Sequence, residues 1–113
     1  MGYWVYLARC GNNAIYTGAT TDLVRRIKEH NQGSAKGKGA KYTAAHRPVV
    51  LAQAWEVRSW SEALRLEYIL KNCQRPEKDR LIEQPQGICR LVEGRDFSLP
   101  IQAVSPDLIK KAE

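Results

Sequence analysis

The sequence predicts an α+β fold, in which helices flank a small three-stranded antiparallel sheet in the order strand, strand, helix, strand, helix, helix. Two short runs rich in β-branched and aromatic residues, 4–8 and 15–17, lie on either side of a turn rich in Gly and Asn. A third run of this kind covers 48–57. Apolar residues at helical spacing follow the second run in 22–30 and the third run in 59–72.

Length and composition indicate one small domain. The chain has 113 residues, 43% of them hydrophobic, which suffices for one modest core but not for two. We assign residues 1–84 to the domain and residues 85–113 to a C-terminal extension of unknown role, which we expect to pack on it. The formal net charge of +6 favours a polyanionic partner, of which nucleic acid is the first candidate.

The cysteines and the first residues predict a cytoplasmic protein. Cys10, Cys73 and Cys89 form no C-x-x-C pair, and we interpret them as reduced thiols. The first residues lack the basic and apolar regions of a signal peptide, and no apolar run approaches the length of a membrane span.

The first two runs predict a hairpin that brings two phenols together. Side chains alternate along a strand, so one face of the hairpin is apolar and the other is aromatic. The apolar face holds Val5, Leu7 and Ile15. With the turn centred near Gly11 and Asn12, Tyr6 and Tyr16 are expected opposite each other. Gly18 is expected to end the second strand, where a side chain would block a ligand.

The helix after the hairpin adds a cation and an imidazole to this unit. Its candidate N-caps are Thr20, Thr21 and Asp22. Leu23 and Ile27 are four residues apart and are expected to face the core. Arg26 and His30 are also four apart and share a different face. One supersecondary unit therefore gathers two phenols, an arginine and a histidine.

The glycine-rich stretch 31–41 has two interpretations. It is either a solvated loop that ends the helix at Gly33, or a basic loop that contacts phosphates and orders on binding. Its lysines are Lys36, Lys38 and Lys41. Tyr42 either stacks on a base or sugar or packs beneath the loop.

The helix at 59–72 carries an acidic residue near its apolar side. Ser59 and Glu62 have the spacing of a capping box. The apolar arc of this helix consists of Ala63, Leu66, Ile69, Leu70 and Cys73. Glu67 falls at the margin of that arc, so its carboxylate needs a partner. That partner is either a lysine or arginine, with Arg65 and Lys71 nearby, or a metal ion beside the sheet.

The remaining sequence predicts short elements. A last helix of the domain is expected at 76–82, with Pro76 in its first turn. In the extension, a strand or hairpin is expected within 88–97, and a helical turn is expected to start at Ser105 and Pro106.

The ordered motifs resemble the GIY-YIG nuclease domain, and most closely its small single-domain bacterial members. The matching residues are Val5-Tyr6, Tyr16-Thr17-Gly18, Asp22-Leu23, Arg25-Arg26, His30, Lys38-Gly39-Ala40-Lys41-Tyr42-Thr43 and Arg47-Pro48-Val49. The resemblance covers about residues 3–83. Two positions depart from the pattern: Trp4 stands in place of the first Gly, and Thr17 replaces Ile.

The resemblance implies a metal-dependent endonuclease that hydrolyses DNA phosphodiester bonds with one divalent ion, Mg²⁺ or Mn²⁺. By matching position, Tyr16 is the general base and Tyr6 orients the water or the phosphate. Arg26 stabilises the transition state, His30 shuttles a proton or holds Tyr16, and Glu67 holds the metal. A guanidinium beside Tyr16 would lower the pKa of that phenol from its usual value near 10.

Several alternatives remain open at this stage. Arg25 could replace Arg26, although the spacing from Gly18 favours Arg26, and Asn72 is a candidate for an asparagine found in some family members. The tyrosines could be ordinary sheet aromatics and His30 a helix C-cap.

Substrate and partners are also open. The main alternative function is a nucleic-acid binding module that cleaves poorly or not at all, and a protein-interaction domain has the least support. DNA repair or recombination is the expected setting. The sequence does not distinguish DNA from RNA, and it leaves open a protein partner or a homodimer.

Overall fold

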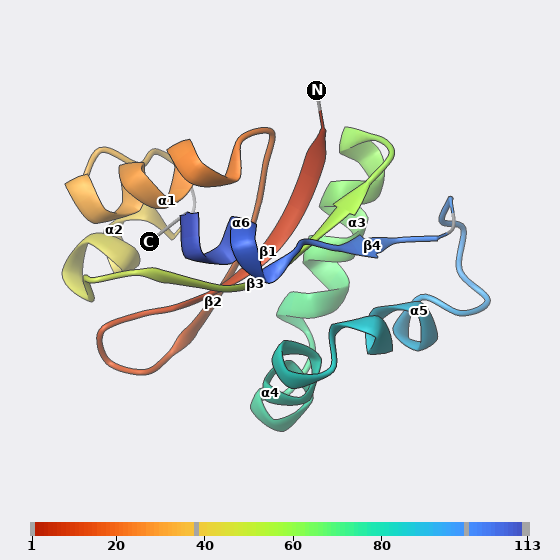
Figure 1. Cartoon of the computed structure of the whole chain (residues 1–113). Helices are drawn as coiled ribbons and strands as arrows, with labels where there is room; N and C mark the ends of the chain where they lie inside the picture. Colours follow the sequence, from red (N-terminus) through yellow and green to blue (C-terminus); the bar gives the residue numbers. More distant parts are fainter. Residues whose placement is uncertain (1, 38, 99, 112–113) are drawn as a thin grey trace.

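A four-stranded antiparallel sheet, in the order β2-β1-β3-β4, forms the centre of the computed structural model, which describes residues 2–37, 39–98 and 100–111 (Figure 1). In chain order the elements are β1 (Tyr3–Arg9), β2 (Ile15–Thr20), α1 (Leu23–Gln32), α2 (Ala40–Ala45), β3 (Val50–Val57), α3 (Trp60–Lys71), α4 (Arg75–Glu83), the 3₁₀ turn η1 (Pro85–Gly87), α5 (Ile88–Leu91), β4 (Gln102–Ala103) and α6 (Pro106–Lys111). The α+β class is confirmed. The expected three strands are joined by a short fourth, β4, which pairs with Trp55 and Glu56 at the edge of β3.

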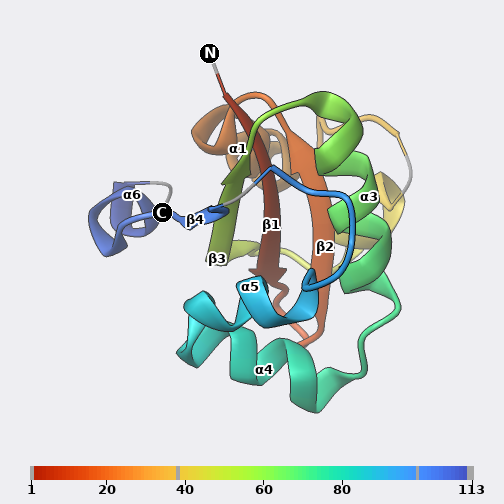
Figure 2. The same ribbon diagram turned by 90° about the vertical axis from the view of Figure 1, so that its right-hand side faces the viewer.

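Helices cover both faces of the sheet, and each face has its own apolar cluster (Figure 2). The first cluster lies between the sheet and α3, α4 and α5, and it includes Val5, Leu7 and Trp55. The second lies on the face covered by α1 and α6, and it includes Tyr6, Leu23 and Ile27. The alternation expected for the first strand is therefore confirmed, and Leu23 and Ile27 are buried as expected. They pack on the Tyr6 face and not on the Val5 and Leu7 face, so the sheet has two apolar clusters where one core was expected.

The hairpin turn is one residue longer than expected, and this changes its register. Cys10 donates its N–H to the carbonyl of Ala14 at 2.9 Å, so three residues form the turn, and Asn13 takes a left-handed φ of 68°. Tyr6 consequently pairs with Gly18, and Tyr16 pairs with Ala8. The two tyrosines share a face but lie diagonally, not directly opposite each other.

Helix starts follow local capping chemistry. Asp22 is the N-cap of α1, where its side chain accepts the N–H of Arg25 at 3.1 Å. Ser59 caps α3 by accepting the N–H of Glu62 at 3.1 Å. The second half of the expected capping box is absent at this position, because the Glu62 carboxylate accepts the N–H of Ser98 at 3.2 Å instead.

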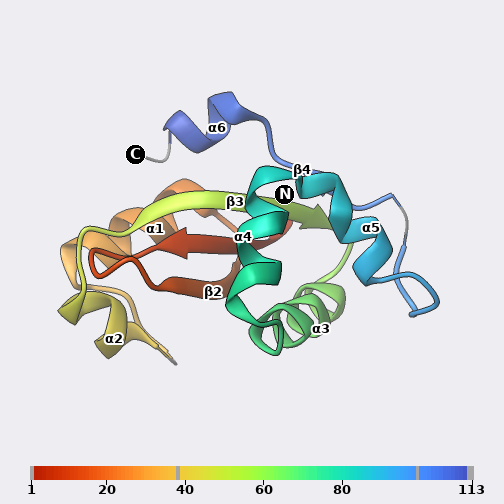
Figure 3. The same ribbon diagram turned by 90° about the horizontal axis from the view of Figure 1, so that it is seen from below.

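The segment 31–41 ends α1 at Gly33, as expected, but it leads into an unexpected helix, α2. Contacts with the hairpin turn hold α2 in place: Gly11 donates its N–H to the carbonyl of His46 at 2.6 Å, and Asn12 donates to the Tyr42 hydroxyl at 2.9 Å. Figure 3 shows α1, α2 and the hairpin tip at the same end of the molecule.

The C-terminal extension contributes to the first cluster. Ile88, Val92 and Ile101 are buried there, and the indole N–H of Trp55 donates to the carbonyl of Pro85 at 2.9 Å. The expected strand or hairpin at 88–97 is wrong: α5 and turns occupy this stretch. Ile88 and Val92 lie four residues apart, and one helical turn buries both.

The extension also contacts α3 from outside. The Arg65 side chain donates to the carbonyl of Asp96 at 2.5 Å and lies over the Phe97 ring at 4.9 Å. The expected terminal helical turn is observed as α6. Within the part of the chain that the structure describes, each helix is too short or too polar to cross a bilayer.

Candidate active site

Two phenols from adjacent strands form the base of the site. The Tyr6 side chain is fully buried, and its ring centroid lies 6.2 Å from that of Tyr16. Gly18 makes this arrangement possible, because a Cβ at that position would overlap the Tyr6 hydroxyl. The close approach at Gly18 is therefore made by a side chain of the protein itself, and β2 continues past Gly18 to Thr20.

His30 connects the phenols to α2. It is fully buried, with Nε2 2.9 Å from the Tyr6 hydroxyl and Nδ1 2.8 Å from the Thr43 hydroxyl. Its ring also packs edge-on against Tyr16, with 5.2 Å between centroids. Burial, with the Arg26 charge as a second cause, lowers the pKa of His30 to about 4. The imidazole is therefore neutral near pH 7, and its two nitrogens form hydrogen bonds with Tyr6 and Thr43.

Arg26 lies beside both phenols. It is the more buried of the two candidate arginines: its side chain is 19% exposed, whereas that of Arg25 is 63% exposed. The Arg26 guanidinium donates to the carbonyl of Lys36 at 2.8 Å and forms an ion pair with Glu29 at 3.4 Å. This geometry favours Arg26 over Arg25 as the cation of the site.

Burial dominates the electrostatics of the phenols. It raises the pKa of Tyr6 far above the usual value, and it also raises the pKa of Tyr16. The charge and hydrogen bonding of Arg26 lower both pKa values, but they do not outweigh burial. The two phenols are therefore protonated near pH 7 in this structure, contrary to the expected shift towards phenolate.

Glu67 approaches the same site from α3. Its negative charge raises the pKa of both Tyr6 and Tyr16, so its carboxylate lies within electrostatic reach of the two phenols. The side chain is 21% exposed and lies 3.7 Å from the Lys71 ammonium, which is the lysine partner considered above. An ion pair this exposed is weak and leaves the carboxylate able to accept another cation.

Glu67 is the residue of this site that could hold a divalent ion. Across residues 2–37, 39–98 and 100–111, no three His, Cys, Asp or Glu side chains gather into a metal-binding cluster. Mg²⁺ commonly binds through one carboxylate together with waters and substrate phosphate oxygens. A single partly exposed carboxylate, such as that of Glu67, is compatible with that kind of site.

The residues expected to contact nucleic acid differ in their exposure and in their contacts within the structure. The Lys36 and Lys41 side chains are exposed, and Lys38 lies outside the described residues. Tyr42 packs against His46, with 4.4 Å between ring centroids, and its hydroxyl accepts from Asn12. The Tyr42 side chain is nevertheless 42% exposed, so stacking on a base or sugar stays a prediction. The Asn72 amide donates to the carbonyl of Tyr68 on its own helix at 2.7 Å.

Two neighbours of the site were not anticipated from the sequence. Thr43 is fully buried beside His30, and Gly39 lies against Tyr16, where a Cβ would overlap the phenol ring. Gly39 has a φ of 81°, and the run of glycines in 31–41 was the available signal for such a position. A threonine followed by two alanines gives no comparable signal of a buried hydrogen bond.

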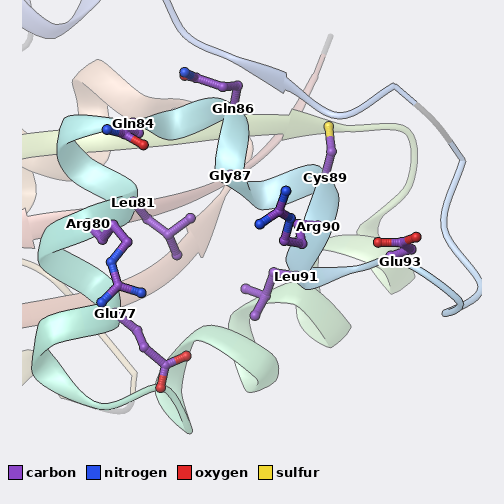
Figure 4. A pocket seen from close by; sticks show the side chains of 10 residues that line it. All are labelled: Glu77, Arg80, Leu81, Gln84, Gln86, Gly87, Cys89, Arg90, Leu91 and Glu93. Atoms are coloured by element: carbon purple, nitrogen blue, oxygen red, sulfur yellow. The ribbon is translucent and has the colours of Figure 1, made fainter.

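A separate pocket of about 870 Å³ lies between α4, η1 and α5 (Figure 4). Its charged lining residues are Glu77, Arg80, Arg90 and Glu93. Two acids and two arginines balance each other, so the lining has no net preference for phosphate. None of the five candidate catalytic residues lines this pocket.

Comparison with known proteins agrees with the motifs. A family model described as the GIY-YIG catalytic domain matches residues 2–80. The UPF0213 protein SH2523 of Staphylococcus haemolyticus is 45% identical over 82 residues, which cover 73% of this chain and 95% of that protein. The UPF0213 protein YazA of Bacillus subtilis is 40% identical over 85 residues, which cover 75% and 82% of the two chains.

A similar structure has also been solved. The solution NMR structure of the UPF0213 protein BH0048 from Bacillus halodurans matches with a TM-score of 0.48 and 33% identity. The match covers 87% of this chain and 100% of the other.

Proposed function

The chain belongs to the GIY-YIG family, and on this premise we propose that it is a metal-dependent endonuclease that hydrolyses DNA phosphodiester bonds. The observation that supports the proposal most is the gathering of groups around the two phenols. Tyr6 and Tyr16 come from the hairpin, Arg26 and His30 come from α1, and the Glu67 charge acts on the phenols from α3.

Each group has a role that its chemistry permits. Tyr16 takes the proton of the attacking water as general base, and Tyr6 orients that water or the phosphate. The planar guanidinium of Arg26 matches the developing charge on the phosphoryl oxygens. His30 remains neutral and holds the Tyr6 hydroxyl at 2.9 Å.

The role of Glu67 is to hold the divalent ion, which when bound would stabilise the leaving 3′ oxygen. The carboxylate also has an effect of its own, because its negative charge raises the pKa of Tyr16. Neutralising that charge would remove one of the causes that raise the pKa of Tyr16 and so increase the phenolate fraction, while burial remains the largest cause. Lys36, Lys38 and Lys41 would contact the backbone of the nucleic acid.

The first test is Glu67→Gln, assayed on a panel of labelled duplex, branched and single-stranded DNA and on RNA, with and without Mg²⁺ or Mn²⁺. We expect metal-dependent cleavage of at least one substrate by the wild type. The variant should lose that cleavage and retain binding, because the amide keeps the shape but not the charge of the ligand. Glu93→Gln, at the α4–α5 pocket, is the matched control and should cleave normally.

A non-catalytic binding module is the second candidate. Two observations favour it: burial keeps both phenols protonated, and the Arg26 guanidinium already binds the Lys36 carbonyl and Glu29. A wild-type protein that binds these substrates but never cleaves any of them with either metal would support this alternative and contradict the endonuclease.

A further inference from the structure

Thr43 closes the buried end of a hydrogen-bond chain that begins in the site. Its hydroxyl oxygen lies 2.8 Å from Nδ1 of His30 and 3.1 Å from the carbonyl oxygen of Ala40. Both Thr43 and His30 are fully buried, so water does not compete for these positions. Thr43 lies on α2, which is tied to the hairpin turn through Asn12 and Tyr42, and this contact fixes Thr43 relative to the phenols.

The number of protons on each group indicates which group donates in each of these hydrogen bonds. The Thr43 hydroxyl has one proton, and the Ala40 carbonyl can only accept, so the hydrogen bond at 3.1 Å forms only when that proton is donated to Ala40. The Thr43 oxygen is then an acceptor towards His30, and Nδ1 of the imidazole must be the donor. In a neutral imidazole the other nitrogen, Nε2, is left with a lone pair.

The donor in the hydrogen bond between His30 and Tyr6 follows by the same reasoning. Because Nε2 of His30 is an acceptor, the Tyr6 hydroxyl must donate its proton to it across 2.9 Å. The lone pairs of the Tyr6 oxygen are then directed away from His30, towards the side on which Arg26 acts on this phenol. With the opposite tautomer, Nε2–H would occupy one of those lone pairs and Tyr6 would have to direct its own proton elsewhere.

We propose that Thr43 is a positioning residue, which holds His30 in the Nδ1–H tautomer and thereby makes the Tyr6 oxygen an acceptor within the site. An accepting phenol oxygen can bind a proton of the attacking water and the N–H groups of Arg26 at once. Thr43 itself does not touch substrate. The tautomer part of this proposal is independent of the proposed function, and only its effect on cleavage rests on that function.

Nitrogen-15 NMR of the imidazole tests the tautomer directly, because protonated and unprotonated ring nitrogens have well-separated shifts. In the wild type at pH 7 we expect His30 to carry its proton on Nδ1. Thr43→Ser keeps the hydroxyl and should keep this tautomer. Thr43→Val has the same shape but no hydroxyl, and should move a large fraction of His30 to the Nε2–H form.

Two further variants separate this effect from loss of packing. Thr17→Val removes another buried hydroxyl, one without a hydrogen-bond partner in the structure, and should leave the His30 spectrum unchanged. Thr43→Ala removes the Thr43 hydroxyl with a smaller side chain, and it replaces Thr43→Val if valine is not accommodated. The unfolding free energy of each variant shows whether it remains folded.

The rate of DNA cleavage by the Thr43 variants is the second measurement. Thr43→Val should reduce kcat by roughly ten- to a hundredfold, the range typical of residues that orient a functional histidine, with little change in KM. Thr43→Ser should restore most of the rate. If the wild type does not cleave any substrate, the proposed function fails but the NMR result still decides the tautomer. A wild-type Nε2–H tautomer, or an unchanged Nδ1–H tautomer in Thr43→Val, would overturn the proposal.

Discussion

Gly37 and Gly39 allow the cost of backbone strain to be measured separately from the cost of a steric clash with Tyr16. Gly37 and Gly39 both have positive φ, of 98° and 81°, so alanine is strained at either position. A Cβ at Gly37 meets nothing within 4 Å, whereas a Cβ at Gly39 would overlap the Tyr16 ring. The two glycines therefore form a matched pair.

We expect Gly39→Ala to lower the unfolding free energy more than Gly37→Ala, which should cost about 1 kcal/mol. The additional cost arises because the Tyr16 ring or the start of α2 must shift. Urea unfolding of both variants measures the difference. Equal losses would show that the loop moves away from Tyr16 at no cost.

His30 gives the molecule a pH dependence with a defined sign. Its pKa is about 4 in the folded state, against an ordinary value of 6.5 in the unfolded chain. Between these values the unfolded state binds more protons, so stability is complete above about pH 6.5 and declines as the pH falls towards 4. The groups that face this imidazole are Tyr6, Tyr16, Arg26, Glu29 and Thr43.

We expect the His30 contribution to lower the unfolding free energy by up to about 3 kcal/mol between pH 7 and pH 4. Urea titrations at several pH values measure this slope. His30→Gln should flatten it, and His46→Gln, at the other histidine, should leave it unchanged. A wild-type slope that persists in His30→Gln would assign the effect to another group.

The sequence predicted which side chains lie close together better than it predicted their contacts. Tyr6, Tyr16, Arg26 and His30 follow from alternation in a hairpin and from spacing on one helix, both of which are local rules. The bond from His30 to Tyr6 instead of Tyr16 depends on the turn, where Asn13 adds a residue and moves the register. Local propensity does not determine turn length to one residue, so this contact could not be predicted.

At the scale of elements, periodic segments were predicted and short ones were not. The hairpin, α1, β3, α3 and α4 each repeat an apolar pattern over several residues, so their types are correct within a few residues at the ends. The helix α2 has six residues and α5 has four, and packing on distant parts of the chain stabilises both. β4 has two residues and exists only through its pairing with β3.

The loop before α2 is expected to bind DNA through its lysines. Lys36 and Lys41 are exposed on either side of Gly39, and each is expected to neutralise one phosphate. The double variant Lys36→Ala/Lys41→Ala should weaken DNA binding and reduce the slope of log K against log[salt] by up to about 0.9 per lysine. Binding measured across a salt series gives this slope.

Arg80→Ala/Arg90→Ala removes the same charge at the α4–α5 pocket and serves as the control. It should leave the salt slope nearly unchanged. An equal loss of slope in both double variants would mean that net charge matters and that the loop has no special role.

At the scale of the whole molecule, the extension is part of the core. Residues 85–113 lie entirely beyond the matched segment 2–80, yet Ile88, Val92 and Ile101 are buried with Val5 and Leu7 on the face covered by α3. We expect Ile88→Ala to cost about 2–5 kcal/mol of unfolding free energy, as for other large-to-small changes in a core.

Cys89 is exposed next to Ile88, so Cys89→Ala is the matched control and should change stability by less than about 0.5 kcal/mol. Urea denaturation measures both variants. A loss below 1 kcal/mol in Ile88→Ala would mean that the extension packs loosely on the domain.

The contacts between the extension and α3 also bear on how related proteins diverge. The C-terminal extension anchors α3, the helix that carries Glu67. Arg65 contacts Asp96 and Phe97 of the extension, and Glu62 accepts the N–H of Ser98. A tail of different length or sequence would tilt that helix and alter the separation between carboxylate and phenols. If the family members cleave as proposed, two relatives with the same residues at the site would then differ in turnover, with the cause located in a segment outside the site.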